Sequence, residues 1–335
     1  MPGRSLIVAA AACALAASAQ TTDKTFYLTH TNTRALQQMA NLIRSIGDIK
    51  AVTVNEDKLA IAVHGTEEQV SIAGWLCSEL DKTPAPISAT VKHEYPGTTT
   101  DNLVLRVFLF AHVPSPQALQ EVVNATRSVA DIQRFFPYFE LNAAAVRGAA
   151  DQVTVADWVM SELDKPAPSV QTLSTEDHPV TFDQRSNLAQ VVFLANTKNP
   201  KAVQEIVNLT RSISDLQRLF PCHSAGALVM RGSPEQVALA DWLLKALDKP
   251  ASQPTLDSAV HEYKVPATVW PEPSIARIYY LGSEQTPQAL QELVNTVRTT
   301  TKVQRVYPNA QANAIAMRGT GDQLAQAEQL IKERM

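Results

Sequence analysis

The chain has 335 residues, of which 45% are hydrophobic and 19% are charged, so it holds enough apolar material for several globular cores. Its formal net charge of -4 gives no electrostatic reason to expect nucleic acid or an anionic membrane surface as a partner.

The first segment, residues 1–19, has the pattern of a secretory signal peptide. Arg4 gives a positive start, residues 6–15 form a short apolar run, and Ala17-Ser18-Ala19 supplies small residues for a cleavage site. That run is too short to cross a membrane, and no later segment approaches ~20 consecutive apolar residues. The sequence therefore predicts cleavage near Ala19, a periplasmic or secreted mature chain, and no transmembrane segment.

The rest of the chain repeats one pattern four times. In each copy an arginine is followed 21 positions later by a glycine, and successive copies are 83, 84 and 87 residues apart. The pairs are Arg44 and Gly65, Arg127 and Gly148, Arg211 and Gly232, and Arg298 and Gly319. Because this period is long for a solenoid unit and suits a small domain with its linker, we expect four tandem domains.

The boundaries of these domains are predicted from the repeat and from the Pro-, Thr- and Ser-rich stretches between copies. The repeats span residues 25–83, 105–166, 189–250 and 276–335. The linkers span residues 84–104, 167–188 and 251–275. Two linkers carry a similar fragment, at residues 91–95 and 260–263, which indicates that they are partly ordered as an added edge strand.

The second copy shows the predicted order of elements within one repeat. Residues 105–110 are rich in β-forming side chains and predict a strand. Ser115-Pro116 then opens a helix, because serine caps the N-terminus and proline fits the first helical position. Residues 132–136 and 143–147 predict two further strands joined as a hairpin, and a second helix covers about residues 151–164.

The other copies repeat the helix caps of the second. The first helix is opened by Asn199-Pro200 and Thr286-Pro287, and the second by the capping boxes Thr66…Gln69, Ser233…Gln236 and Thr320…Gln323. The sequence predicts an α+β fold of four tandem βαββα domains, each a small three-stranded sheet with two helices on one face. A unit of ~60 residues is only marginally large enough for its own core, so we expect contacts with neighbouring units or subunits.

Two stretches resemble the short repeated N-terminal, KH-like domains of outer-membrane secretins. One runs from Val229 to Val237 and ends in Leu247-Asp248-Lys249-Pro250, and the other runs from Asn313 to Thr320. All four copies share the order of elements, so the resemblance covers roughly residues 25–82, 105–165, 189–249 and 276–335.

The resemblance implies a fold and a tendency to associate. In secretins such domains stack side by side into periplasmic rings and receive pilins, substrates or inner-membrane components. A secretin continues into a long β-rich pore region, which we do not expect in a sequence that reaches Met335 at the end of the fourth unit. The leading hypothesis is therefore an exported, non-catalytic assembly, adaptor or scaffold protein of an envelope or secretion system. It would act through protein partners or self-association.

The first helix of every copy carries a stripe of three polar residues, which are candidates for an interface. A glutamine, an asparagine and an arginine follow each other at spacings of four and three, which puts them on one face. The stripe comprises Gln37, Asn41, Arg44, Gln120, Asn124, Arg127, Gln204, Asn208, Arg211, Gln291, Asn295 and Arg298. One interpretation is a repeated contact with the next unit or subunit. The other is local, since the helix dipole favours an arginine near the C-terminus by ~0.3–1 kcal/mol.

A second set of arginines flanks the predicted hairpins of the last three copies and is a candidate for anion binding. The pairs are Arg134 and Arg147, Arg218 and Arg231, and Arg305 and Arg318. In a symmetric register they face each other across adjacent strands and need an anion or carboxylate between them. That group could belong to a neighbouring unit or to an anionic ligand such as a cell-wall polymer. A register slip of one residue would instead place them on opposite faces.

The alternative function follows from these arginines: a module that binds an envelope polymer or a peptide. The first copy has Ala51 and His64 at the two positions, so such a site would be absent there.

Catalytic and metal-binding motifs are missing from the sequence. The seven histidines show no paired ligand spacing, and no Gly-rich phosphate loop or nucleophile elbow occurs. The Gly-x-x-Gly clamp of nucleic-acid-binding KH modules is also missing. We therefore expect no enzyme, no cofactor, no metal and no nucleic-acid partner. Trp75, Trp158 and Trp242 share one helix position, where the last copy has Gln329, and are predicted to pack over the sheet or the linker.

Overall fold

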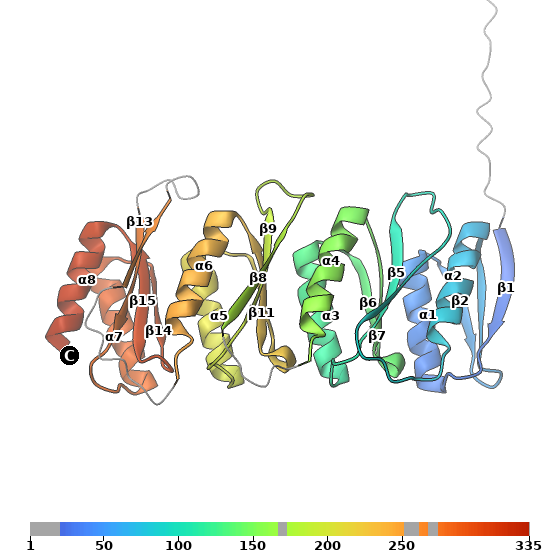
Figure 1. Ribbon diagram of the computed structural model, residues 1–335, viewed down its shortest axis with the longest axis horizontal. Coiled ribbons are helices and arrows are strands. Elements are labelled where there is room, and N and C mark those ends of the chain that lie inside the picture. The colour runs from blue at the N-terminus through green and yellow to red at the C-terminus, as the bar shows by residue number, and fades with distance from the viewer. Residues whose placement is uncertain (1–20, 167–172, 251–260, 267–273, 335) are drawn as a thin grey trace, which may run out of the picture. The chain divides into compact units, whose positions relative to one another are not determined.

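The computed structural model describes residues 21–166, 173–250, 261–266 and 274–334. The predicted signal peptide and parts of the second and third predicted linkers lie outside these ranges. The chain divides into two compact units, residues 1–78 and 79–335. The described residues of both units form four small antiparallel sheets and eight α-helices (Figure 1).

The first unit holds one three-stranded sheet and two helices. Its elements are β1 (Thr21–Tyr27), α1 (Thr33–Gly47), β2 (Ala51–Asn55), β3 (Ala60–Thr66) and α2 (Glu67–Leu80). The strand order is β1-β3-β2, so the last strand of the repeat lies in the middle of the sheet. Leu36, Met39 and Ile43 of α1 are fully buried, because they recur at the helical spacing that keeps them on one face.

The second unit contains three further copies of this arrangement, each with one more strand. The second repeat has β4 (Val91–Glu94), β5 (Val104–Leu109), α3 (Pro116–Ala130), β6 (Arg134–Tyr138), β7 (Ala143–Gly148) and α4 (Ala150–Leu163). The third repeat has β8 (Ser174–Pro179), β9 (Leu188–Phe193), α5 (Pro200–Ser214), β10 (Arg218–Cys222), β11 (Ala227–Gly232) and α6 (Pro234–Leu247). The fourth has β12 (His261–Val265), β13 (Ser274–Tyr280), α7 (Pro287–Thr301), β14 (Arg305–Asn309), β15 (Ala314–Gly319) and α8 (Gly321–Arg334).

The predicted α+β class and βαββα order are confirmed, and so are the edge strands expected in the first and third linkers. The sheets of the last three repeats therefore exceed the predicted three strands, and the second linker adds a strand that was not expected. Three of the four have four strands, with the orders β4-β5-β7-β6, β8-β9-β11-β10 and β12-β13-β15-β14. The added strands β4, β8 and β12 come from the predicted linkers and pair antiparallel with the first strand of the repeat. An added strand satisfies backbone groups that an open sheet edge would leave unpaired.

The helix caps predicted from the sequence form hydrogen bonds that also join the two helices of a repeat. The Ser233 hydroxyl accepts from the Gln236 amide at 3.3 Å, and the Gln236 side-chain carbonyl accepts from the Ser233 amide at 3.1 Å. The Gln236 side chain then donates to the Asp215 carbonyl oxygen, 3.0 Å away at the end of α5. The start of the second helix is thus tied to the end of the first.

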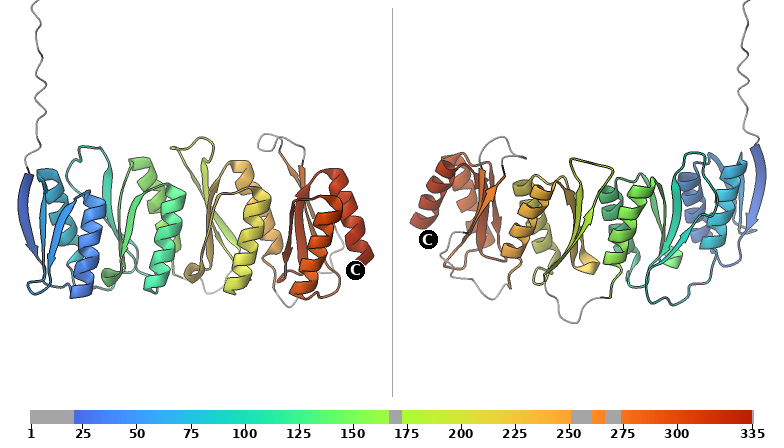
Figure 2. Two further views of the ribbon diagram at one scale, coloured as in Figure 1. Left: turned by 180° about the vertical axis from the view of Figure 1, so that it is seen from behind. Right: turned by 45° about the horizontal axis from the view of Figure 1, so that its top comes forward.

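Within the second unit, each later sheet packs on the helices of the repeat before it. Val191 and Val229 of the third sheet share one buried apolar cluster with Val122 of α3 and Val155 of α4. Residues of the fourth sheet, such as Ile278, likewise join the cluster of α5 and α6. Figure 2 shows these alternating layers of sheet and helix in the second unit from behind and in a tilted view. The helix pairs of the second and third repeats are therefore covered on two faces.

Across the described ranges, each helix is too short or too polar to span a bilayer.

Candidate functional site: paired arginines between repeats

The arginine pairs of the predicted hairpins face each other in the structure. Arg218 lies directly opposite Arg231, Arg305 opposite Arg318, and Arg134 opposite Arg147. The hairpins therefore have the symmetric register, and the alternative with a slip of one residue is wrong. Directly opposed residues project from the same face of a sheet, and like charges there are destabilising unless acceptors lie between them.

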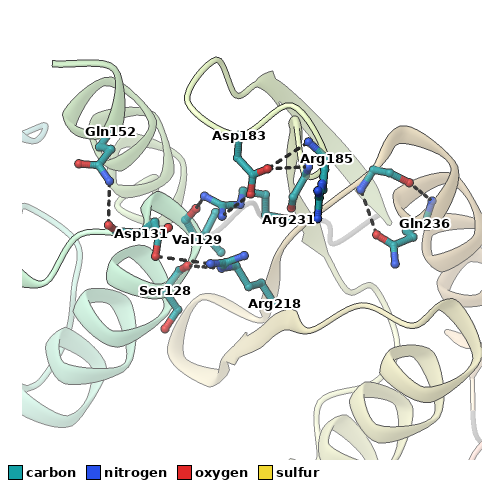
Figure 3. A network of polar contacts seen from close by, with 11 residues as sticks. Ser128, Val129, Asp131, Gln152, Asp183, Arg185, Arg218, Arg231 and Gln236 are labelled. Carbon is teal, nitrogen blue, oxygen red and sulfur yellow. Dashed lines mark hydrogen bonds and ion pairs between the residues drawn. The ribbon is translucent and has the colours of Figure 1, made fainter. Parts of the chain in front are cut away.

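Arg231 has one acceptor in the preceding repeat and another in a loop of its own repeat. The side chain is fully buried, and its Nη1 donates to the carbonyl oxygen of Val129 at 2.6 Å (Figure 3). Its Nη2 lies 3.3 Å from an oxygen of Asp183, in the loop between β8 and β9. The guanidinium also stands over the Phe182 ring, 4.9 Å from its centroid. Burial lowers the pKa of Arg231 from its ordinary value, and repulsion from Arg218 lowers it further.

Arg218 binds the same helix end as its partner. Its Nε donates to the carbonyl oxygen of Ser128 at 3.0 Å, and its Nη2 lies 3.4 Å from the carboxylate of Asp131 (Figure 3). Ser128 and Val129 belong to the last turn of α3, whose carbonyl groups have no partner within the helix. The guanidinium groups of Arg218 and Arg231 therefore lie at the negative end of the α3 dipole, and Arg218 also pairs with the Asp131 side chain that follows the helix.

The fourth repeat uses the same contact on the third. Arg305 donates from Nε to the Ser212 carbonyl oxygen at 3.1 Å, and it forms an ion pair with Asp215 at 2.5 Å. The buried Arg318 pairs with the other oxygen of Asp215. Asp215 follows the last residue of α5, as Asp131 follows α3. The Asp215 carboxylate pairs with both guanidinium groups of the fourth repeat, whereas in the third repeat Arg218 pairs with Asp131 and Arg231 with Asp183.

A glutamate on each of these helices adds a second contact between repeats. The Glu121 carboxylate of α3 accepts from the His223 amide at 2.9 Å, and Glu205 of α5 accepts from the Ala310 amide. Burial raises the pKa of Glu205, which the Ala310 amide only partly offsets. Each covered helix is therefore fixed by a backbone amide near its middle and by the arginine pair at its end.

Arg147 of the second repeat has a carboxylate partner within its own repeat. Arg147 is 6% exposed, and its Nη2 donates to Asp101 at 2.9 Å. Asp101 lies in the loop between β4 and β5, as Asp183 lies in the loop between β8 and β9. Burial raises the pKa of Asp101, but hydrogen bonds from Arg147 and from the Leu103 amide outweigh it, so the pKa is lowered overall.

The polar stripe of the first helices makes hydrogen bonds inside each repeat. Arg44 donates to the Val52 carbonyl oxygen at 2.6 Å, and Arg298 donates to that of Val306 at 2.9 Å. Arg211 makes the corresponding bond to Leu219. These arginines therefore link the first helix to the strand that follows it.

The amides of the stripe pair along the helix. The side-chain bonds are Gln120 to Asn124 at 3.0 Å, Gln204 to Asn208 at 2.8 Å and Gln291 to Asn295 at 3.2 Å. In the first unit Gln37 donates to Glu56 and Arg44 to Asn41, while Arg127 occupies the last turn of α3. Asn208 and Gln291 line one shallow groove between the third and fourth repeats. An interface role for the stripe stays a prediction.

The acceptors at the helix ends were not singled out from the sequence, although a signal for them exists. An aspartate stands four residues after the stripe arginine in three copies, as Asp48, Asp131 and Asp215. All three adopt the left-handed conformation with φ between 56° and 58°. A glycine usually holds that position, so a recurring aspartate there indicates a use for its carboxylate. The fourth copy has Lys302 instead.

Two surfaces have exposed, different side chains at the positions that form contacts between repeats elsewhere. On the first sheet, Ala51 and His64 replace the arginines, and both are exposed together with Thr53 and Asn55. On α8, Gln326 and Gln329 are exposed at the positions where the third repeat has Leu239 and Trp242. Equivalent positions lie at equal distances in sequence from the glycine that ends the third strand of each repeat: Gly65, Gly148, Gly232 and Gly319.

Trp158 and Trp242 pack over linker strands, as predicted. The Trp158 ring stacks on His178 of β8 with centroids 4.9 Å apart, and the Trp242 ring lies 5.6 Å from that of Tyr263 in β12. Each indole thus connects the second helix of one repeat to the added strand of the next.

The described residues give no sign of a metal or redox site. Among them, no group of three or more His, Cys, Asp and Glu side chains is placed to hold a metal ion. Cys77 and Cys222 are both buried as free thiols. Burial raises the pKa of Cys222, so this thiol stays protonated and unreactive.

No family model and no curated protein matches the chain. Among solved structures, it is similar to the N-terminal domain of the secretin XcpQ from Pseudomonas aeruginosa, at 10% identity and a TM-score of 0.19, over 44% of this chain and 63% of that one. ExeD from Aeromonas hydrophila is similar at 15% identity and a TM-score of 0.16. The secretin GspD from Escherichia coli K12 is similar at 11% identity and a TM-score of 0.16. Both matches cover 69% of this chain and 40% of the other. The chain therefore spans less than two thirds of each of these structures.

Proposed function

We propose that the protein is an exported, non-catalytic assembly or scaffold component of the bacterial envelope, which acts through contacts between proteins in a secretion-type system. One observation carries the proposal: the same contact, an arginine pair on the end of a helix, joins the second repeat to the third and the third to the fourth. The repeated unit is therefore a device for binding another copy of its own fold.

The physical chemistry of this contact suits a scaffold. A guanidinium buried as completely as that of Arg231 loses several kcal/mol of hydration, which its hydrogen bonds and ion pairs must offset. Such a contact contributes little net stability, but it strongly disfavours any other placement of the sheet on the helices. The repeats are consequently held in a fixed register, as an assembly protein requires.

The positions of the polar stripe fit the same proposal. The side chains of Gln120, Asn124, Gln204 and Asn208 are exposed or half-buried on the first helices. They keep donors and acceptors available at one place in every repeat. Because the sequence resembles ring-building secretin domains, we expect protein subunits to bind this surface. The predicted signal peptide at residues 1–19 gives the expected location.

The alternative, a module that binds an envelope polymer or peptide through the arginine pairs, has less support. In the third and fourth repeats both guanidinium groups already bind main-chain carbonyl and carboxylate oxygens of the preceding repeat. An anionic ligand would have to displace these contacts. If it does so, replacing Arg218 and Arg231 together by alanine will abolish polymer binding while the fold stays intact.

Recovery of the protein from the envelope of its own host tests the proposal. The tagged chain is cross-linked in intact cells, purified under native conditions and weighed by light scattering. We expect one or more specific protein partners, or a mass above that of a single mature chain. A variant without residues 1–19 is the control and must lose those partners. A monomer at tens of micromolar that recovers no partner contradicts the proposal.

A further inference from the structure

Among the residues that the structure describes, no strand lies along the outer edge of β1, where the later sheets carry an added one. Among the described residues, β1 pairs only with β3, whereas β5, β9 and β13 each have an added strand on the other side. Six of the seven residues of β1 are exposed, and Tyr27 is 68% exposed. An unprotected edge presents unpaired N–H and C=O groups, which are a template for another strand.

The later repeats show which side chains accompany an added strand. Arg106, Gln190 and Arg277 occupy one position, since each lies opposite the residue two before the glycine that ends the repeat's third strand. An acid of the added strand lies directly across from each of them: Glu94, Asp177 and Glu262. All three pairs are bonded, with Gln190 to Asp177 at 2.7 Å and Arg277 to Glu262 at 2.8 Å.

In the first sheet the same position holds Lys24, which lies opposite Val63. Its ammonium group stands over the ring of Phe26 at 5.3 Å from the centroid and is exposed to solvent. In two of the later repeats the residue at this position also contacts an acid on the second helix, and the first repeat has no acid there. Arg106 and Arg277 each contact an acid of the second helix, Asp157 or Glu328, at 3.3 Å. The first repeat has Gly74 at that helix position.

We propose that the β1 edge binds an extended strand of a partner protein, with an acidic residue of that strand placed opposite Lys24. The inference rests on the proposed function and adds the chemistry of the partner to it. The occupant is argued from the three strands of this chain that already fill the corresponding edge, all with an acid in the same register. Lys24 is the cation that such a strand would neutralise.

The chain's own preceding residues are poorly suited to this role. In the later repeats eight or nine residues separate the added strand from the next one. The same connection would place an added strand before β1 within the predicted signal peptide, and the proposed cleavage near Ala19 would remove it. That segment also offers no acidic residue.

A peptide taken from this chain is a suitable probe, because its strand is known to fit the corresponding edge. The peptide covers residues 258–266, with blocked termini and a fluorescent label, and contains Glu262 for pairing with Lys24. Its binding to the chain from Gln20 onward is measured by fluorescence anisotropy. Hydrogen–deuterium exchange of the backbone amides of residues 21–27 is measured with and without it. We expect saturable binding and slower exchange in β1.

Charge exchange identifies the contact. Lys24→Glu replaces an attraction by a repulsion across the strands, so the affinity should fall roughly tenfold. A peptide with Glu262→Lys should show the opposite preference and recover binding to the Lys24→Glu chain. Lys58→Glu, in the exposed turn between β2 and β3, makes the same change of charge elsewhere and must leave binding unaltered.

Three results would overturn the inference. They are no binding of the peptide, equal binding by Lys24→Glu and wild type, or a dimer of the chain that Lys24→Glu dissociates, since a second copy would then be the occupant. Because the assay uses purified protein and peptide, its failure leaves the partners recovered from the envelope unaffected. A failure of that recovery likewise leaves peptide binding intact.

Discussion

The first and third sheets share strand order and register but differ on the face that points away from their own helices. In the third sheet this face carries Arg218, Phe220 and Arg231, and Arg231 is fully buried. In the first sheet the same positions are Ala51, Thr53 and His64, all exposed. The inner faces of both sheets are apolar and buried on their own helices. The inner face thus defines the repeat, and the outer face decides whether a further layer can pack on it.

The outer faces also differ in how deeply their charged side chains are buried. His64 of the first sheet pairs with Asp23 at 2.8 Å, with both side chains largely in water. Such exposed pairs contribute about 0–1 kcal/mol. In the third sheet Arg231 is withdrawn from water and Arg218 is half-buried, and both donate to carbonyl groups at a helix end. A substitution at the same strand position should therefore have very different effects in the two sheets.

The largest effect is expected for Arg231→Met. The substitution removes the bond to the Val129 carbonyl oxygen and leaves Asp183 without its cation, which should cost about 2–4 kcal/mol. His64→Met changes the corresponding exposed residue and should alter stability by less than about 0.5 kcal/mol. Urea unfolding followed by tryptophan fluorescence measures both. Equal effects would show that the outer face of the third sheet is not a buried interface.

A smaller effect is expected for Trp242→Gln, which gives the third repeat the residue that α8 has as Gln329. The indole is only partly buried and packs on Tyr263, so its loss should cost about 2 kcal/mol. Gln329→Ala is the control, since Gln329 is exposed, and should change stability by less than about 0.5 kcal/mol. Thermal unfolding by circular dichroism provides the comparison. An unchanged melting temperature for Trp242→Gln would contradict the packing of helices on the next linker strand.

The smallest effect is expected from the carboxylate of Asp101. Its pKa is lowered in the folded chain, so its contribution to stability is present above the unfolded value of about 4 and is lost as the pH falls through the folded value. Between about pH 5 and pH 2, the urea midpoint of wild type should fall more steeply than that of Asp101→Asn. Asp57→Asn, in the exposed turn of the first unit, should follow wild type. Parallel curves for all three proteins would exclude a stabilising pair with Arg147.

Much of the fold could be predicted because its signals are local. Caps such as Ser115-Pro116 and Ser233…Gln236 act within four residues of themselves, and the structure forms them as the sequence indicates. The apolar spacing of α3 and the short connections of the hairpins are local too. The fourfold repetition strengthened each of these signals, because an element that is ambiguous in one copy is clear in another.

The candidate site could be predicted only in part, because its partners are distant in sequence. The arginine pairs were evident, and a carboxylate of a neighbouring unit was one of the expected acceptors. Their register depends on a single residue in the turn, which the sequence left open. The carbonyl group of Val129 lies 102 positions from Arg231, and a main-chain acceptor has no side-chain signature. The edge strand at residues 174–179 was missed for a related reason, since it lacks the fragment that the other two linkers share.

A double-mutant cycle on Asp215 and Arg318 tests most directly whether arginine pairs hold successive repeats together. Asp215→Asn, Arg318→Met and the double variant are compared with wild type by urea unfolding. Because the two side chains form an ion pair between the third and fourth repeats, we expect a coupling free energy of about 1–3 kcal/mol. Single effects that add to within about 0.5 kcal/mol would contradict the account.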